Sequence, residues 1–242
     1  MPPANLCKVC KNLEISKIYP IEKPQTKANL CKVCKDLQAH FGNAIFAQNE
    51  LIMNFNFDPE HTFFTSDTHF NHANIIKFCN RPFKDVEQMN ESMIANWNRV
   101  VGMDDTVFHL GDFCLGGAAE WTKVLDRLNG KIYLILGNHD LKNLRQGFIG
   151  RFEHVAMQMH ITIGKQRIYL CHYPFLCFEG GYREVWQLFG HVHSRKNNTG
   201  LDVERLQYLY PTQYDVGVDN NDFTPVSFEQ VNQIIKKQLD KQ

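Results

Sequence analysis

Five short segments of this 242-residue chain carry side chains of the kinds that bind divalent metal ions. Carboxylate, amide oxygen and imidazole together suit Mn, Fe, Zn or Ni, whereas an all-oxygen set would suit Mg or Ca. Two such ions about 3.5–4 Å apart can clamp both oxygens of an in-line phosphoryl displacement and lower the pKa of a bound water to roughly 7. The segments are Asp67-Thr68-His69, Gly111-Asp112, Gly137-Asn138-His139-Asp140, His172 and Gly190-His191-Val192-His193.

Each segment follows a run that is typical of a buried β-strand. In open α/β sheets, ligands bind at the carboxyl ends of the strands, so these side chains are expected to meet there. Three segments begin with a glycine, which permits a tight backbone path that turns the next side chain inward. The expected strands span residues 62–66, 106–110, 131–136, 168–171 and 185–189.

The rest of the chain from residue 55 alternates between strand-like and helix-like patterns, as in a layered α/β domain. Apolar residues recur near a 3.6-residue period over 85–101, which predicts an amphipathic helix. A short helix is expected over 72–79, and Ser227 could cap a terminal helix. A hairpin is expected to pair residues 160–163 with 168–171, and residues 214–218 indicate a late strand.

Composition limits the function classes that remain. Lys plus Arg and Asp plus Glu both number 26, so no global field attracts long nucleic acid or an anionic membrane. The apolar runs are too short to span a bilayer, and the N-terminus lacks the apolar segment of a secretory signal. We therefore expect a cytoplasmic protein with no membrane partner and no strong nucleic-acid signal. The sequence does not indicate the oligomeric state.

We predict that residues 1–52 form an extension and that residues 53–242 form the main domain. They contain a repeat, in which Asn5 to Leu13 recurs as Asn29 to Leu37, and each copy holds a C-x-x-C pair. The spacing between the pairs approximates that of a four-thiolate structural zinc site, but a recent duplication gives the same spacing without metal. Zinc and a metal-free extension both stay open. The four candidate ligands are Cys7, Cys10, Cys31 and Cys34.

The five segments, in this order, resemble the signature of the calcineurin-like metallophosphoesterase superfamily: D-x-H, G-D, G-N-H-[DE], H and G-H-x-H. The likeness covers about residues 60–225. Residues 64–76, Arg81-Pro82-Phe83 and Asn96-Trp97-Asn98 are similar to a group of small bacterial and phage members. The resemblance implies a four-layer α/β/β/α sandwich of two mixed β-sheets, with the site on one edge.

The resemblance also implies a role for each residue. A hydroxide that bridges two metal ions would attack phosphorus in line, with His139 as general acid and Asp140 orienting its ring. The first metal would be held by Asp67, His69 and His193, and the second by Asn138, His172 and His191, with Asp112 bridging both.

Other residues are open to more than one interpretation. His72 and Arg81 follow the first segment and are candidates to contact a substrate phosphate, but a helix-capping histidine and a salt-bridged surface arginine fit equally well. Packing or surface roles are favoured for His109, His154 and His160.

The predicted function is a dinuclear metal-dependent phosphoesterase acting on a small phosphorylated mono- or diester, with nucleotides among the candidates. The alternatives are a catalytically inactive binding scaffold with the same fold, and an interaction module built on the cysteine extension. All seven expected metal ligands are present, which favours the enzyme.

Overall fold

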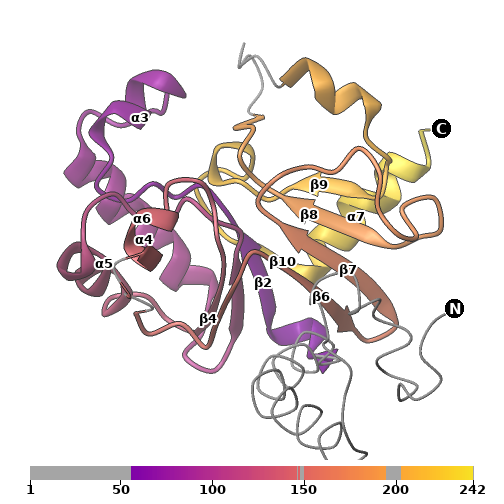
Figure 1. Cartoon of the computed structure of the whole chain (residues 1–242), viewed down its shortest axis with the longest axis horizontal. Coiled ribbons are helices and arrows are strands. Elements are labelled where there is room, and N and C mark those ends of the chain that lie inside the picture. Colours follow the sequence, from indigo (N-terminus) through magenta and orange to yellow (C-terminus); the bar gives the residue numbers. More distant parts are fainter. Residues whose placement is uncertain (1–55, 146, 148–149, 195–202, 242) are drawn as a thin grey trace, which may run out of the picture. The chain divides into compact units, whose positions relative to one another are not determined.

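The computed structural model describes residues 56–145, 147, 150–194 and 203–241 (Figure 1). All of them belong to one compact unit, Asn54–Gln242. The expected extension, with Cys7, Cys10, Cys31 and Cys34, lies outside the described residues. Within the described part of the chain, no helix has the length and apolar character that crossing a membrane requires.

Two five-stranded mixed sheets form the centre of the unit. In one, β10 runs antiparallel to β2 and the other neighbours are parallel. In the other, β6 and β7 form an antiparallel hairpin and the remaining pairs are parallel. The first has the order β10 (Val226–Ser227), β2 (Thr62–Thr65), β3 (Thr106–His109), β4 (Lys131–Ile135) and β5 (His154–Ala156). The second has the order β1 (Asn56–Phe57), β6 (Gln158–Ile163), β7 (Gln166–Cys171), β8 (Trp186–Phe189) and β9 (Gln213–Asp215).

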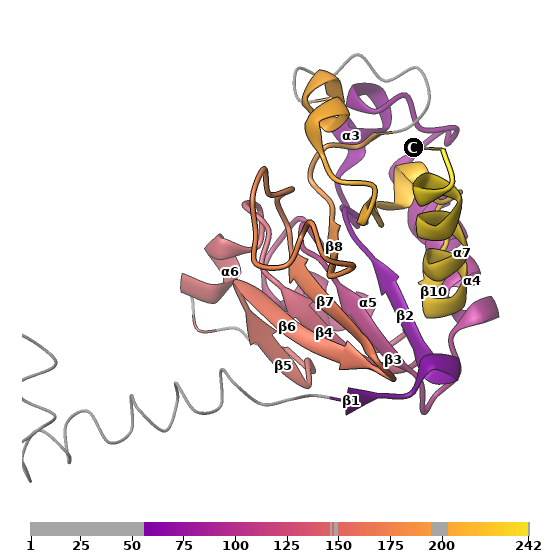
Figure 2. The ribbon, with the colours of Figure 1, turned by 90° about the vertical axis from the view of Figure 1, so that its right-hand side faces the viewer.

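Side chains alternate between two cores along each strand, because successive residues of a strand point to opposite faces. In β2, Phe63 packs toward the helices, whereas Phe64 joins the core between the two sheets. β3 repeats the pattern with Val107 and Phe108. The two sheets therefore lie face to face, as Figure 2 shows for β6 and β7 in front of β3 and β4.

Helices cover the sheets on two sides. On one side, α4 (Val86–Val100) and α5 (Ala118–Leu125) supply Met89, Trp97 and Trp121 to the outer core. α7 (Phe228–Leu239) contacts β2 and β10 of the first sheet and β9 of the second, and its Val231 and Ile235 join the core between the sheets. This is the predicted fold class of two mixed sheets with flanking helices. The shorter helices are α3 (Ala73–Phe78), α6 (Leu141–Arg145), η2 (Pro59–His61), η3 (Val203–Tyr208) and η4 (Val218–Asn220).

The long periodic elements agree closely with the sequence prediction. Asp85 caps α4 by accepting from Gln88 N–H, and Ser227 caps α7 in a capping box. The late strand differs, because β9 ends at Asp215 and Val218 already begins a 3₁₀ turn. The elements that the sequence did not predict are the eight-residue α5 and short pieces such as β5 and β10.

Candidate metal centre

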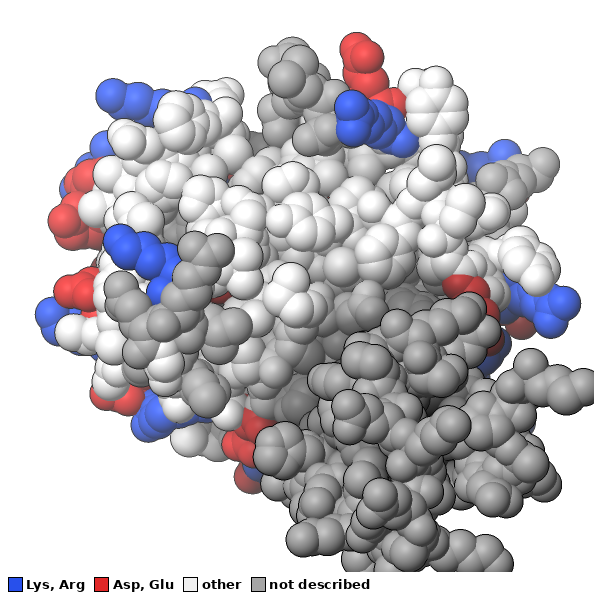
Figure 3. Space-filling view, viewed as in Figure 1, with Lys and Arg blue, Asp and Glu red and all other residues white. Residues whose placement is uncertain are grey.

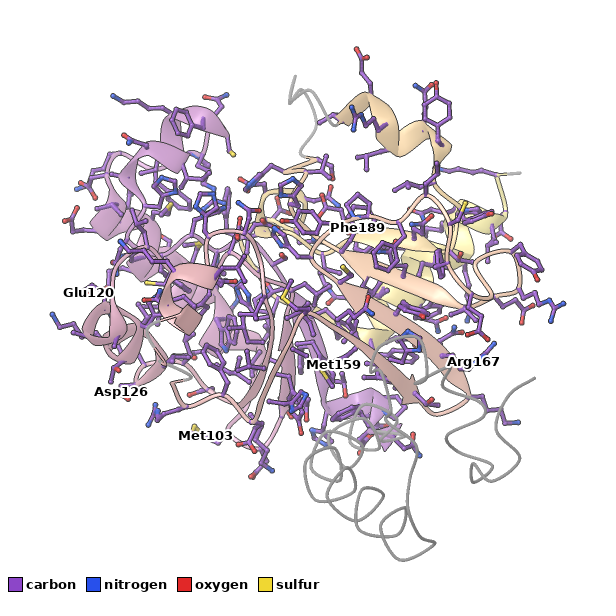
Figure 4. All side chains as sticks on the ribbon, viewed as in Figure 1. Met103, Glu120, Asp126, Met159, Arg167 and Phe189 are labelled. Atoms are coloured by element: carbon purple, nitrogen blue, oxygen red, sulfur yellow. The ribbon has the colours of Figure 1, made fainter. Side chains whose placement is uncertain are left out.

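The loops that follow β2 and β3 are tied together at the carboxyl ends of these strands. Asp67 N–H donates to Gly111 O at 2.9 Å, and His69 N–H donates to Asp112 O at 3.0 Å. Phe70 and Cys114 continue the pairing as an isolated bridge. In Figure 4, Phe189 at the end of β8 lies toward this edge, and Met103 lies at the opposite end of the first sheet.

Five of the seven expected ligands have a left-handed backbone. The φ angle is 57° at Asp67, 48° at His69, 56° at Asp112, 70° at His191 and 50° at His193. Such conformations cost of order 1–3 kcal/mol each in residues other than glycine, and they persist where the surroundings impose them. Five of the ten described non-glycine residues with a positive φ angle are expected ligands. No sequence pattern reveals these angles.

Two of the glycines that precede expected ligands are required by close approach. A Cβ atom at Gly190 would lie 2.1 Å from Ser66 Oγ and 2.2 Å from Asp67 Oδ2. A Cβ atom at Gly137 would lie 2.2 Å from Asp112 Oδ1. These glycines therefore allow the loops after β8 and β4 to approach the aspartates of the loops after β2 and β3, as the sequence predicted.

Asp67, His69 and His193 form the first group of ligand atoms. Asp67 Oδ1 lies 4.0 Å from His69 Nε2 and 3.8 Å from His193 Nε2. Asp67 Oδ1 and His69 Nε2 are buried, and neither has a hydrogen-bond partner among the described residues. Burying polar atoms without partners is costly, so their convergence indicates a site for a cation. Donors that share one ion at about 2.1 Å lie roughly 3–4 Å apart, which fits this spacing.

Asp112, His172 and His191 form the second group. His172 Nδ1 donates to Leu110 O at 2.7 Å, which leaves Nε2 as the nitrogen that can bind a metal. His172 Nε2 lies 3.2 Å from Asn138 Oδ1. Asp112 Oδ2 lies 3.6 Å from both His172 Nε2 and His69 Nε2, so it stands between the two groups. The residues present therefore fit two divalent ions.

The two histidines of the first group differ in protonation in the metal-free protein. Burial holds the pKa of His69 well below its usual value, so its ring is neutral, as a metal ligand must be. Burial also opposes charge on His193, but its hydrogen bonds with Asp219 and Cys79 and the nearby Asp67 carboxylate raise its pKa to about 11. The His193 proton thus provides positive charge beside Asp67, and binding of a metal would release it.

His139 and His72 lie on the open side of the two groups. His139 Nε2 is 4.0 Å from Asp112 Oδ2, and its side chain is about half exposed. The ring centroid of His72 lies 5.3 Å from that of His69 and 6.1 Å from that of His139. Both imidazoles are therefore placed where a substrate that is bound at the metals can reach them.

Asp140 has a different role from the one that the sequence suggested. Its buried carboxylate accepts from the backbone N–H groups of Asp112 (2.7 Å), Phe113 (2.9 Å) and Gly137 (2.9 Å). In the described residues, these bonds engage both of its oxygens, and none joins it to the ring of His139. The expected orienting contact is thus corrected: Asp140 clamps the loop after β3 to the loop after β4.

Arg81 lies beneath the site and does not face the open side. Its guanidinium forms a two-pronged ion pair with Asp219 at 2.9 and 2.7 Å, and both side chains are fully buried. It also donates to the backbone oxygens of Asp67 (2.7 Å) and Thr68 (3.0 Å). Asp219 Oδ2 in turn lies 2.7 Å from His193 Nδ1. Of the two interpretations left open for Arg81, the structure shows the salt bridge, buried and not on the surface, and this placement supports a positioning role.

The sequence analysis did not single out Tyr173. This residue directly follows His172, and its ring centroid lies 4.7 Å from that of His191. Asp219 follows the expected late strand, where a place at the site and a simple turn were both open, and the structure puts its carboxylate against His193. His109 has the packing role that was favoured: it is fully buried, lies 2.9 Å from Thr68 Oγ1, and desolvation lowers its pKa to about 3.

Comparisons with known proteins agree with this geometry. An uncharacterized protein of Methanocaldococcus jannaschii is 35% identical over 176 residues, which cover 71% of this chain and 89% of that protein. The Gene 66 protein of Mycobacterium phage L5 is 27% identical, with 59% of this chain and 86% of that protein covered. The crystal structure of a protein of unknown function from Aquifex aeolicus has a TM-score of 0.54 at 26% identity, covering 72% of this chain and 98% of the other.

The model of the calcineurin-like phosphoesterase family matches residues 61–223, which include every strand-end segment described above. Its members are hydrolases that cleave phosphate esters with the help of divalent metal ions. The match spans more than half of the chain, and the aspartates and histidines of the family signature converge in the structure. This chain therefore belongs to the calcineurin-like phosphoesterase family and is a metal-dependent phosphoesterase.

Proposed function

We propose that the active centre holds two metal ions and hydrolyses a small phosphate mono- or diester. The observation that carries this proposal is the position of Asp112 Oδ2, which lies 3.6 Å from a histidine nitrogen of each ligand group. A carboxylate in that position suits a bridge between neighbouring cations. Asp67, His69 and His193 would hold one ion, and Asn138, His172 and His191 the other, with Asp112 shared.

The two ions, when bound, would neutralise charge on the phosphate and lower the pKa of a water molecule. Mixed nitrogen and oxygen donors suit manganese among other transition metals. The protein's own contribution is a rigid arrangement, because hydrogen bonds to Asp140 fix the loops after β3 and β4. His139, on the open side, would donate a proton from Nε2 to the leaving oxygen.

Replacing His139 with alanine should lower kcat by roughly 10²–10⁴-fold, because general acid catalysis contributes about that much. Metal content should stay unchanged, since the His139 side chain is half exposed and belongs to neither ligand group. Steady-state kinetics together with elemental analysis of the variant check both statements. Parallel loss of metal would instead make His139 a ligand.

The proposed function is tested with purified full chain, loaded with Mn²⁺ and assayed on chromogenic phosphate monoesters and diesters. We expect chelator-sensitive hydrolysis of at least one of them, and activity on neither would contradict the proposal.

A shortened chain that begins at Met53 is measured in the same assay. We propose that residues 53–242 carry catalysis without the extension, so equal specific activity is expected, and collapse of activity would exclude this division.

An inactive scaffold with the same fold is the second candidate. The structure offers no support for it, since every expected ligand is present and the two groups of ligand atoms converge.

Elemental analysis decides separately whether the cysteine pairs of the extension bind zinc. Zinc that is lost with residues 1–52 would support a structural zinc site in the extension.

A further inference from the structure

A cavity of about 490 Å³ adjoins the second ligand group. It lies between the segment that follows β7 and the helix η3, and His191 forms part of its wall. This volume falls within the range of small-molecule sites, which is roughly 300–1,000 Å³. Its lining includes Tyr173, Leu176, His191, Arg205, Leu206 and Tyr208.

The cavity shares two wall residues, Tyr173 and His191, with the edge of the metal centre. The Tyr173 hydroxyl lies 3.5 Å from Asn138 Oδ1, and its ring centroid lies 4.7 Å from that of His191. One side of Tyr173 therefore touches the proposed ligands, and the residue also lines the cavity. A phosphate ester that binds at the metals can extend its organic group into this space.

The lining is rich in aromatic and aliphatic side chains that are exposed to solvent. Tyr208 is 69% exposed and Leu176 is 68% exposed. Large apolar side chains gathered on a surface commonly mark a binding site. Among the described residues, few charged side chains lie on the face between α3 and η3 (Figure 3). Arg205 adds a cation that can lie against a flat ring or donate hydrogen bonds.

We infer that this cavity binds the nucleoside portion of a phosphate ester, with its base against Tyr173 and Tyr208. Aromatic side chains bind the faces of bases by stacking, and this contact tolerates any base. A single six-membered ring would fill only a small part of the cavity, whereas a base with its ribose is of suitable size. The inference rests on the proposed function, because it places the ester phosphate at the metals.

A binding experiment on metal-free protein tests the cavity independently of catalysis. The full chain, stripped with a chelator, is titrated by calorimetry with adenosine and, in parallel, with ribose. Adenosine should bind at least tenfold more tightly than ribose. Tyr208→Ala should weaken adenosine binding about 5- to 150-fold, which corresponds to the loss of one stacked side chain. Tyr182→Ala is the matched control, because Tyr182 is 70% exposed but lies outside the lining, and it should leave binding unchanged.

Inhibition of the Mn²⁺-loaded enzyme then links the cavity to the active centre. Adenosine 5′-monophosphate should inhibit hydrolysis of a chromogenic ester more strongly than ribose 5-phosphate, and Tyr208→Ala should remove the difference. Equal binding of adenosine and ribose, or equal effects of Tyr208→Ala and Tyr182→Ala, would overturn the inference. Absence of all hydrolysis would contradict the proposed function instead, while the metal-free titration still decides the role of the cavity.

Discussion

Replacing Asp112 with asparagine should reduce kcat by at least roughly a thousandfold, because charge stabilisation by a metal ion is worth several kcal/mol. The carboxylate lies within 3.6 Å of His69 Nε2 and His172 Nε2, so its charge serves both proposed ions. The neutral amide should leave the fold intact. Its oxygen can still accept from His139 N–H, as Asp112 Oδ1 does at 2.9 Å, and burial already raises the pKa of this carboxyl.

Three measurements check this expectation: turnover with Mn²⁺, metal content, and unfolding by urea in the presence of a chelator. Asp105→Asn is the matched control, because Asp105 precedes the same strand, β3, that Asp112 follows. Asp105 bonds to Gly102 N–H and His61 at the other end of that strand, so its variant should retain activity. Turnover close to that of the unmodified protein in Asp112→Asn would contradict the bridging role.

Replacing Arg81 with methionine should destabilise the metal-free protein by about 3–5 kcal/mol, which is typical when one partner of a buried ion pair is removed. The variant would remove the two-pronged partner of the buried Asp219 carboxylate, leave His193 as its remaining charged partner, and deprive two backbone oxygens of their donor. The matched control is Arg127→Met. Arg127 makes an equally close pair with Glu91, but both side chains are largely exposed, so the cost should stay below about 1 kcal/mol.

A second variant separates stability from site geometry. Adding Asp219→Leu to Arg81→Met removes both charges, and replacing a buried pair with apolar groups is often neutral for stability. His193 would still lack the carboxylate that lies 2.7 Å from its Nδ1. Stability should therefore recover in part, since two backbone oxygens still lack a donor, while Mn²⁺ affinity should be roughly 10–100-fold weaker, as is typical when the partner of a ligating histidine is lost. Full recovery of affinity would show that Asp219 does not position His193.

The sequence was most informative where local patterns determine structure. Buried strands with donors at their ends predicted which segments meet, because parallel strands deliver their carboxyl ends to one edge of a sheet. Capping at Ser227 likewise depends on neighbouring residues, and this cap forms as expected. The layered sandwich of two sheets came from the family resemblance, since periodicity does not distinguish it from a doubly wound sheet.

Features that depend on distant contacts could not be predicted in this way. Asp140 lies next to His139 in sequence, but the turn directs its carboxylate to backbone N–H groups of two loops. Arg81 and Asp219 are 138 residues apart, and only the folded chain brings them into one buried pair. The left-handed angles at Asp67 and Asp112 arise from hydrogen bonds between loops, which no spacing encodes.

The central proposal is that two ions share Asp112, and anomalous diffraction from crystals of the full chain grown with Mn²⁺ tests it most directly. Two peaks about 3.5–4 Å apart are expected. Asp67, His69 and His193 should contact one of them, Asn138, His172 and His191 the other, and Asp112 both. A single ion between these groups, or ions bound only elsewhere in the chain, would contradict the dinuclear centre.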